Sequence, residues 1–151
     1  MTERHDIIPI DSMDILPYGR AIFYYETDQM GIVHHSNYIR WMEEARLDFL
    51  NQIGLPYDKM EEEGILVPVL SVNTQYKLAF HYGDTFSINC KLEKLSGIKF
   101  TVSYEIYNAE TRLLHADGIT EHCFVTKKMV PVRMPREYPE IYQRLLTFKE
   151  H

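Results

Sequence analysis

The sequence has few cysteines, no long apolar run and no cluster of basic residues. Its two cysteines, Cys90 and Cys123, lie in strand-like apolar segments and are too few for a disulfide framework. We expect both to be reduced, buried thiols in a cytoplasmic protein. No stretch approaches 18 apolar residues, so no membrane-spanning helix is predicted. The early apolar run at residues 7–10 is interrupted by Pro9 and is too short for a signal peptide.

Positive charge is scarce as well. Sixteen Lys and Arg stand against 22 Asp and Glu, which gives a net charge of −6, and the only basic doublet is Lys127–Lys128. A surface that follows nucleic-acid phosphates needs clustered positive charge, so no nucleic-acid partner is expected. With 45% hydrophobic residues, seven Gly and seven Pro in 151 residues, the composition is that of one ordinary globular domain.

The first half of the chain predicts a strand followed by one long helix. After a loose leader at residues 1–17, the segment 18–26 (YGRAIFYYE) is aromatic and β-branched enough for a strand, and residues 28–31 form a break. Ser36 or Asn37 is the expected N-cap of the helix, and Gly54 with Pro56 its stop. One apolar stripe at steps of three and four residues marks the buried helix face: Tyr38, Trp41, Met42, Ala45, Phe49 and Ile53.

The second half predicts strands. Residues 65–127 form four long β-rich runs, separated by breaks at 82–84, 96–97 and 109–112, and a final helix is expected at 137–148. We therefore expect an α+β fold, an antiparallel meander wrapped around the single long helix, as one domain over residues 18–151. The other sheet face and the strand edges favour association of copies, as a homodimer or a homotetramer.

The densest group of reactive side chains spans residues 23–46. Asp28 lies between the first strand and the helix, beside helix N-terminal amides that favour negative charge. From the residues alone, Asp28 is either a turn or capping residue or a carboxylate beside an oxyanion site. His34 and His35 are adjacent, so only one is expected to face such a site, and Tyr24 and Tyr25 should alternate across the strand.

These residues resemble a known family. The pattern Tyr24-x-x-x-Asp28-x-x-Gly31-Ile32-Val33-His34-His35-x-Asn37-Tyr38, continued by Arg40-Trp41-x-Glu43-x-Ala45-Arg46, is similar to the 4-hydroxybenzoyl-CoA thioesterase family, more narrowly to its YbgC-type acyl-CoA thioesterases. Weaker matches follow at Pro68-Val69, at the 82–84 turn and at Pro131 to Pro135. The resemblance runs from Tyr18 to the final helix and implies a hotdog fold, a sheet wrapped around one long helix.

The resemblance also implies roles. Asp28 falls on the family's catalytic carboxylate, Tyr24 and His35 fall on the positions that flank it, and the backbone N–H near His35 falls where the thioester carbonyl is polarised. Asp28 would act as general base on water or as nucleophile through a mixed anhydride, and the sequence leaves both open. His34 is expected to be structural. The further substrate-binding candidates are Gly31, Val33 and Ser71.

Alternatives remain at the level of sequence. Glu43 or Glu44 would carry the reaction if the chain followed a hotdog lineage with its carboxylate on the central helix. The substrate would be acyl-CoA or an acyl group on acyl carrier protein; a non-catalytic acyl-thioester-binding protein, or a dehydratase or hydratase using His35 as base, would be the rival functions.

No cofactor or metal is expected, because a thioester is already activated. His81, His115, His122 and Cys123 also lack a compact ligand spacing. Coenzyme A would enter as part of the substrate, and its phosphates need basic partners. The candidates are Lys77, Lys91, Lys94, Lys99, Arg133 and Arg136.

Overall fold

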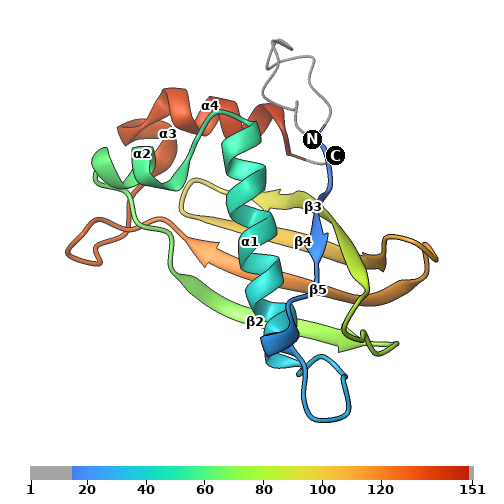
Figure 1. Ribbon diagram of the computed structural model, residues 1–151. Coiled ribbons are helices and arrows are strands. Elements are labelled where there is room, and N and C mark those ends of the chain that lie inside the picture. Colours follow the sequence, from blue (N-terminus) through green and yellow to red (C-terminus); the bar gives the residue numbers. More distant parts are fainter. Residues whose placement is uncertain (1–14, 150–151) are drawn as a thin grey trace.

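The computed structural model describes residues 15–149 and shows one five-stranded sheet with a long helix across its concave face (Figure 1). This arrangement confirms the expected α+β hotdog fold. Of the leader expected at residues 1–17, residues 1–14 lie outside the described part. The elements in chain order are β1 (Tyr18–Ala21), the 3-10 helix η3 (Tyr24–Glu26), α1 (Ser36–Gln52), α2 (Tyr57–Glu62), β2 (Val69–Tyr76), β3 (Thr85–Leu95), β4 (Lys99–Asn108), β5 (Leu114–Cys123), α3 (Met134–Glu137) and α4 (Pro139–Thr147).

The strand order is β1-β3-β4-β5-β2, with every neighbouring pair antiparallel. The expected hairpins join β3 to β4 and β4 to β5, but the expected meander of four strands is wrong at its first strand. β2 lies at the far edge beside β5. Residues 77–84 connect it to β3 and pair on the way with residues 31–33, just before α1. Phe80 anchors this crossing: it is fully buried, its ring lies 5.5 Å from that of Trp41, and its carbonyl accepts the N–H of Val33 at 2.9 Å.

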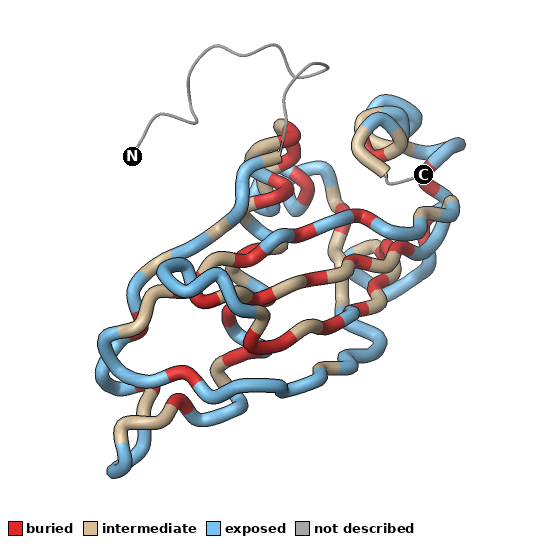
Figure 2. Tube along the Cα trace, turned by 90° about the vertical axis from the view of Figure 1, so that its right-hand side faces the viewer, coloured by how far each residue is buried: buried red, intermediate tan, exposed pale blue. Residues whose placement is uncertain are grey.

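The apolar stripe of α1 packs on the sheet as its spacing predicts. Trp41, Met42 and Ala45 are almost fully buried, and the burial of a large apolar side chain contributes about 1.5–3 kcal/mol. Along β4 and β5 buried positions alternate with more exposed ones (Figure 2), so each strand gives one face to the helix. Gly118 of β5 is required by this packing, since a Cβ there would lie 2.7 Å from the sulfur of Met42.

The first strand is shorter than predicted. β1 ends at Ala21, and residues 24–26 form a 3-10 turn that the side chain of Glu26 closes by accepting the N–H of Phe23 at 2.9 Å. Tyr24 and Tyr25 therefore do not alternate between a core face and an outer face. Both rings are exposed, at 72% and 76%.

The helix ends agree with the sequence only in part. Gly54 adopts φ = +84° just beyond α1 and provides the expected stop. Neither expected N-cap is correct, because α1 already includes Ser36 and Asn37. The N-cap is His35, and Nδ1 of the preceding residue, His34, accepts the N–H of Ser36 at 3.2 Å. His34 is thus structural, as expected. At the C-terminal end, the single predicted helix is two helices, α3 and α4.

Candidate functional site

Asp28 lies at the head of a tight loop between η3 and α1. The loop closes through a bridge between Thr27 and Val33 and a hydrogen bond from the N–H of Asp28 to the carbonyl of Ile32 at 2.8 Å. Gly31 permits the turn with φ = +77°. The bridge, the hydrogen bond and the glycine turn together fix the backbone of Asp28.

One oxygen of the Asp28 carboxylate accepts hydrogen bonds, and the other has no hydrogen-bond partner among the described residues. Oδ1 accepts the N–H groups of Met30 at 2.8 Å and Ile32 at 3.2 Å. Oδ2 has no hydrogen-bond partner among the described residues, and the side chain is exposed. Asp28 is therefore both a turn residue and a carboxylate with one oxygen available to accept a proton or to attack a carbonyl carbon.

One backbone N–H at the start of α1 is free. The amide of His34 donates to the carbonyl of Glu26 at 3.0 Å, that of Ser36 to the His34 ring, and that of Asn37 to the carbonyl of His34 at 3.0 Å. Within residues 15–149 the N–H of His35 has no acceptor. It lies at the positive end of a 17-residue helix, where a donor stabilises a developing oxyanion.

The rings of His35 and Tyr24 have different partners. The exposed His35 ring stacks on His34 at 4.5 Å and meets the edge of Tyr76 at 5.9 Å. The Tyr24 ring meets Tyr82 at 5.4 Å. No hydrogen bond joins Asp28, His35 and Tyr24 in the part of the chain that the structure describes, so these three residues do not form a hydrogen-bonded triad.

The three substrate-binding candidates have different surroundings. Gly31 is part of the loop, and its carbonyl accepts the N–H of Tyr82 at 3.0 Å. Val33 is buried in the core. Ser71 is exposed near the start of β2, five residues before Tyr76, which corresponds to roughly 16 Å along a strand. The structure thus groups Gly31 and Val33 with Asp28 and leaves Ser71 apart.

Of the two helix glutamates, Glu44 makes structural contacts. Glu44 accepts hydrogen bonds from the Tyr18 hydroxyl at 2.8 Å and from Nε of Arg20 at 3.0 Å. Glu43 is exposed on α1. The occupied Glu44 carboxylate makes the helix-carboxylate alternative weaker than the Asp28 reading.

Glu26 is an important residue that the sequence did not indicate. Its carboxylate is fully buried and accepts hydrogen bonds from both terminal nitrogens of Arg20, at 3.1 and 2.9 Å, and from Nε1 of Trp41 at 2.9 Å. Burial alone would raise the pKa of Glu26, but the hydrogen bonds from Arg20 and Trp41 outweigh burial and lower it. An acidic residue that follows two tyrosines gives no sequence signal of burial.

Tyr76, for which the sequence left acyl binding and core packing equally open, lies close to the start of α1. It ends β2, its ring lies 5.1 Å from that of Tyr38, and its hydroxyl is 3.5 Å from the carbonyl of His35. Of the basic residues considered for coenzyme A, Lys77 alone follows this position directly; it forms a 3.9 Å ion pair with Asp117. The others lie on β3, on β4 or around α3: Lys91, Lys94, Lys99, Arg133 and Arg136.

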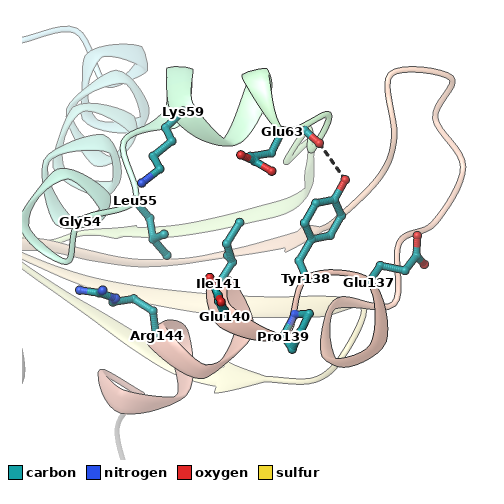
Figure 3. Close-up of a pocket in the computed structure, with 10 residues that line it drawn as sticks. All are labelled: Gly54, Leu55, Lys59, Glu63, Glu137, Tyr138, Pro139, Glu140, Ile141 and Arg144. Carbon is teal, nitrogen blue, oxygen red and sulfur yellow. Dashed lines mark hydrogen bonds between the residues drawn. The ribbon is translucent and has the colours of Figure 1, made fainter.

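A hollow in the described part of the chain lies at the other end of α1 (Figure 3). It measures about 500 Å³ and lies where the loop after α1 meets α2, α3 and α4. Lys59 and Arg144 approach it from one side, and Tyr138 donates its hydroxyl to the carbonyl of Glu63 at 2.8 Å on the other. A 17-residue helix is roughly 25 Å long, so this cavity is separate from the Asp28 loop.

Neither a metal cluster nor a membrane span is found in residues 15–149. No three His, Cys, Asp or Glu side chains are grouped there for a metal ion. None of the described helices is long and apolar enough to cross a bilayer.

Comparison with known proteins assigns this arrangement to one group. Residues 24–145 match the family model described as the thioesterase-like superfamily. A solved DHNA-CoA thioesterase from Staphylococcus aureus is 33% identical with a TM-score of 0.81, covering 85% of this chain and 87% of that one. A hypothetical protein, AQ1494, from Aquifex aeolicus is 39% identical with a TM-score of 0.76, covering 87% and 99%. The acyl-CoA thioester hydrolase YbgC of Escherichia coli O6:H1 is 24% identical over 115 residues, 76% of this chain and 86% of that protein.

Proposed function

This chain belongs to the thioesterase-like superfamily and is a thioester hydrolase, and we propose that it cleaves acyl-CoA with the Asp28 carboxylate and the free N–H of His35. One observation supports this assignment above the others. The loop that leaves Oδ2 of Asp28 open runs directly into the helix start at which the amide of His35 is open. A carboxylate and an unpaired amide near one helix start provide the two groups that thioester hydrolysis needs.

In the general-base route, Oδ2 of Asp28 takes a proton from water while the water oxygen bonds to the thioester carbon. The carbonyl oxygen becomes negative and accepts the N–H of His35. Collapse of this intermediate breaks the C–S bond, releases the CoA thiolate and leaves the carboxylic acid. The proton held by Asp28 then passes to the thiolate or to solvent.

In the nucleophilic route, Oδ2 of Asp28 bonds to the carbonyl carbon and the thiolate leaves, giving a mixed anhydride. Water then cleaves the anhydride, frees the acid and restores the carboxylate. The same amide stabilises the oxyanion in both routes, and loss of one such donor typically costs about 10²–10³ in rate. Neither route needs a cofactor or metal.

The rings of His35 and Tyr24 border the acyl group in this proposal. His35 positions the attacking water or polarises the carbonyl, and Tyr24 flanks Asp28 from the η3 side. The thioester sulfur is a good leaving group, so these rings contribute less than the carboxylate. Lys77, next to the site-facing Tyr76, is the proposed contact for a coenzyme A phosphate.

The working unit is proposed to be a homodimer, with a homotetramer as a higher assembly. β2 is an edge strand, and α1 does not cover its inner face: Val72 and Tyr76 stay 39% and 47% exposed. Exposed apolar side chains also surround the Asp28 loop, among them Tyr24, Met30 and Tyr82. A second copy placed on β2 would cover these groups and close the site. Free Cys90 and Cys123 fit the cytoplasm as the compartment of this assembly.

Free-thiol release tests the proposal. The native protein and Asp28→Asn are assayed with short-, medium- and long-chain acyl-CoAs, an aryl-CoA and acyl groups on acyl carrier protein. We expect the native protein to hydrolyse at least one CoA ester and the variant almost none, with oligomer size unchanged. Equal turnover by both proteins would mean that another group carries the reaction. Thiol release from acyl carrier protein alone would mean that the substrate is an acyl group on carrier protein rather than acyl-CoA. No release from any ester would favour a binding function.

A further inference from the structure

Glu26 contacts both segments that make up the proposed site. It lies two residues before Asp28, at the end of η3, and its side chain and its carbonyl point to different partners. The side chain reaches β1 and the middle of α1, whereas the carbonyl reaches the start of α1. One residue thereby joins the Asp28 loop to the core of the fold and to the helix start.

The side-chain contacts fix the first segment. The buried carboxylate has four donors: two from Arg20, one from the indole of Trp41 and one from the N–H of Phe23, all within 3.1 Å. The Arg20 guanidinium is fixed in turn, because it lies 4.2 Å from the centre of the Phe23 ring and also binds Glu44. Four donors restrict the carboxylate to one orientation. This in turn restricts the backbone that leads from Glu26 to Asp28.

The main-chain contacts fix the second segment. The carbonyl of Glu26 accepts the N–H of His34 and the side-chain amide of Asn37, both at 3.0 Å. These contacts engage the N–H of His34 and the side-chain amide of Asn37. Among the described residues, the N–H of His35 between them has no acceptor. The position of Glu26 therefore sets the position of that donor.

A buried charge of this kind is not by itself evidence of a stabilising role. Removing two charges from water is costly, and apolar residues of the same volume usually stabilise a core equally well. Arg20, Glu26 and Trp41 instead define a geometry that apolar packing would leave adjustable.

We propose that Glu26 is the positioning residue of the site, holding Asp28 and the N–H of His35 in the register that thioester hydrolysis requires. The inference rests on the proposed function of that site. It assigns Glu26 no contact with substrate. Its effect passes through the backbone on both of its sides.

The test compares Glu26→Gln and Trp41→Phe with Asp28→Asn and the native protein. Glu26→Gln keeps the shape but places an NH₂ against donors. Trp41→Phe removes the indole N–H together with one of the two fused rings of a fully buried side chain. Thr120→Val is the stability control, because it breaks buried hydrogen bonds to Tyr104 and His122, neither of which contacts the Asp28 loop. Kinetics use the CoA ester that the native protein hydrolyses best, at a temperature where every variant is folded.

We expect Glu26→Gln and Trp41→Phe to lower kcat by about 10–100-fold, since a displacement of about 1 Å has this effect, while KM changes little. Thr120→Val should lose thermal stability and keep kcat. Trp41 is the only tryptophan, so Glu26→Gln should also shift the emission spectrum. A folded Glu26→Gln with native kcat, beside an inactive Asp28→Asn, overturns the positioning role and keeps the proposed function. If Glu26→Gln does not fold, a native kcat in Trp41→Phe overturns it equally.

Amide hydrogen exchange at His34 tests the positioning role of Glu26 without an activity assay. The N–H of His34 is bonded to the Glu26 carbonyl, so a displaced Glu26 should speed its exchange in both variants and leave it unchanged in Thr120→Val. Should the native protein release no thiol from any ester, the proposed function fails, and unchanged His34 exchange in Glu26→Gln would overturn the positioning role separately.

Discussion

Trp41 donates its indole N–H to the buried carboxylate of Glu26 at 2.9 Å. This bond connects a fully buried residue in the second turn of α1 to the loop that carries Asp28. The core and the proposed site therefore share one rigid connection. Substitutions that deform the loop and substitutions that only loosen the core should have separable effects on activity and stability.

Gly31→Ala should reduce both stability and activity. At φ = +77° an alanine is strained by about 1–2 kcal/mol, although a Cβ there would meet no atom within 4 Å. The strain falls on the turn that holds Asp28, so kcat should fall as well. Gly64→Ala is the matched control, since Gly64 has φ = +93° and lies beyond α2. It should lose similar thermal stability with kcat unchanged, and a loss of kcat in both variants would contradict the assignment.

Gly118→Ala should destabilise the fold by about 1–3 kcal/mol. The new Cβ would lie 2.7 Å from the sulfur of Met42 and 3.1 Å from the carbonyl of Asn73. The Met42 side chain can move, but the β2 backbone cannot move without disturbing its pairing with β5. Chemical denaturation measures the change. A second substitution, Met42→Ala, should not restore native stability, whereas full restoration would show that the sulfur contact alone matters.

Stability should fall as the pH decreases from about 6.5 toward 4. Burial holds the pKa of His122 down, at about 4, so the folded protein keeps this ring neutral while the unfolded chain binds a proton near pH 6.5. The contribution is fully present above pH 6.5 and shrinks by up to about 3 kcal/mol as the pH falls to 4. His122→Phe, which keeps the stacking on Phe100, should show a flatter dependence in urea titrations at several pH values. An unchanged slope would rule out His122 as the cause.

Tyr76 should contribute through its ring more than through its hydroxyl. The hydroxyl lies 3.5 Å from the carbonyl of His35, too far for a strong hydrogen bond, whereas the ring contacts His35 and Tyr38. Tyr76→Phe should therefore keep kcat and KM, and Tyr76→Ala should raise KM. Steady-state kinetics distinguish the two, and equal defects in both variants would assign the role to the hydroxyl.

The inner face of β2 should be the contact between copies. Val72→Asp places a charge on that face and should convert the dimer to monomers with loss of activity. Ile119→Asp is the control, because Ile119 is also exposed, at 51% against 39% for Val72, but lies on the outer face of neighbouring β5. Light scattering after gel filtration measures the mass. A native protein that is already monomeric would contradict the proposed assembly.

The parts of the fold that follow from periodicity were predictable. The helical stripe from Tyr38 to Ile53 and the alternation along β4 depend on neighbours in sequence, and both are confirmed. The place of β2 was not predictable, because it depends on Phe80 packing under α1 rather than on the turn at residues 82–84. β1 ended early for a similar reason, since Glu26 folds back onto Arg20.

The site, like the fold, was predictable only where it depends on residues that are close in sequence. The spacing from Asp28 to the helix start indicated a carboxylate near unpaired amides, and the structure shows an open Oδ2 and an open His35 N–H. Glu26 escaped notice because its partners, Arg20 and Trp41, lie 6 and 15 residues away and meet only in the folded chain. The catalytic roles of Asp28, His35 and Tyr24 stay predictions until they are assayed.

The rate of the chemical step in a single turnover tests the central claim most directly. Excess native protein or excess Asp28→Asn is mixed with the preferred acyl-CoA, and thiol release is followed in the first turnover. Loss of a positioned carboxylate should slow this step by about 10²–10⁴-fold while a non-hydrolysable CoA analogue binds both proteins equally. A chemical step as fast in Asp28→Asn as in the native protein would contradict the assignment of Asp28.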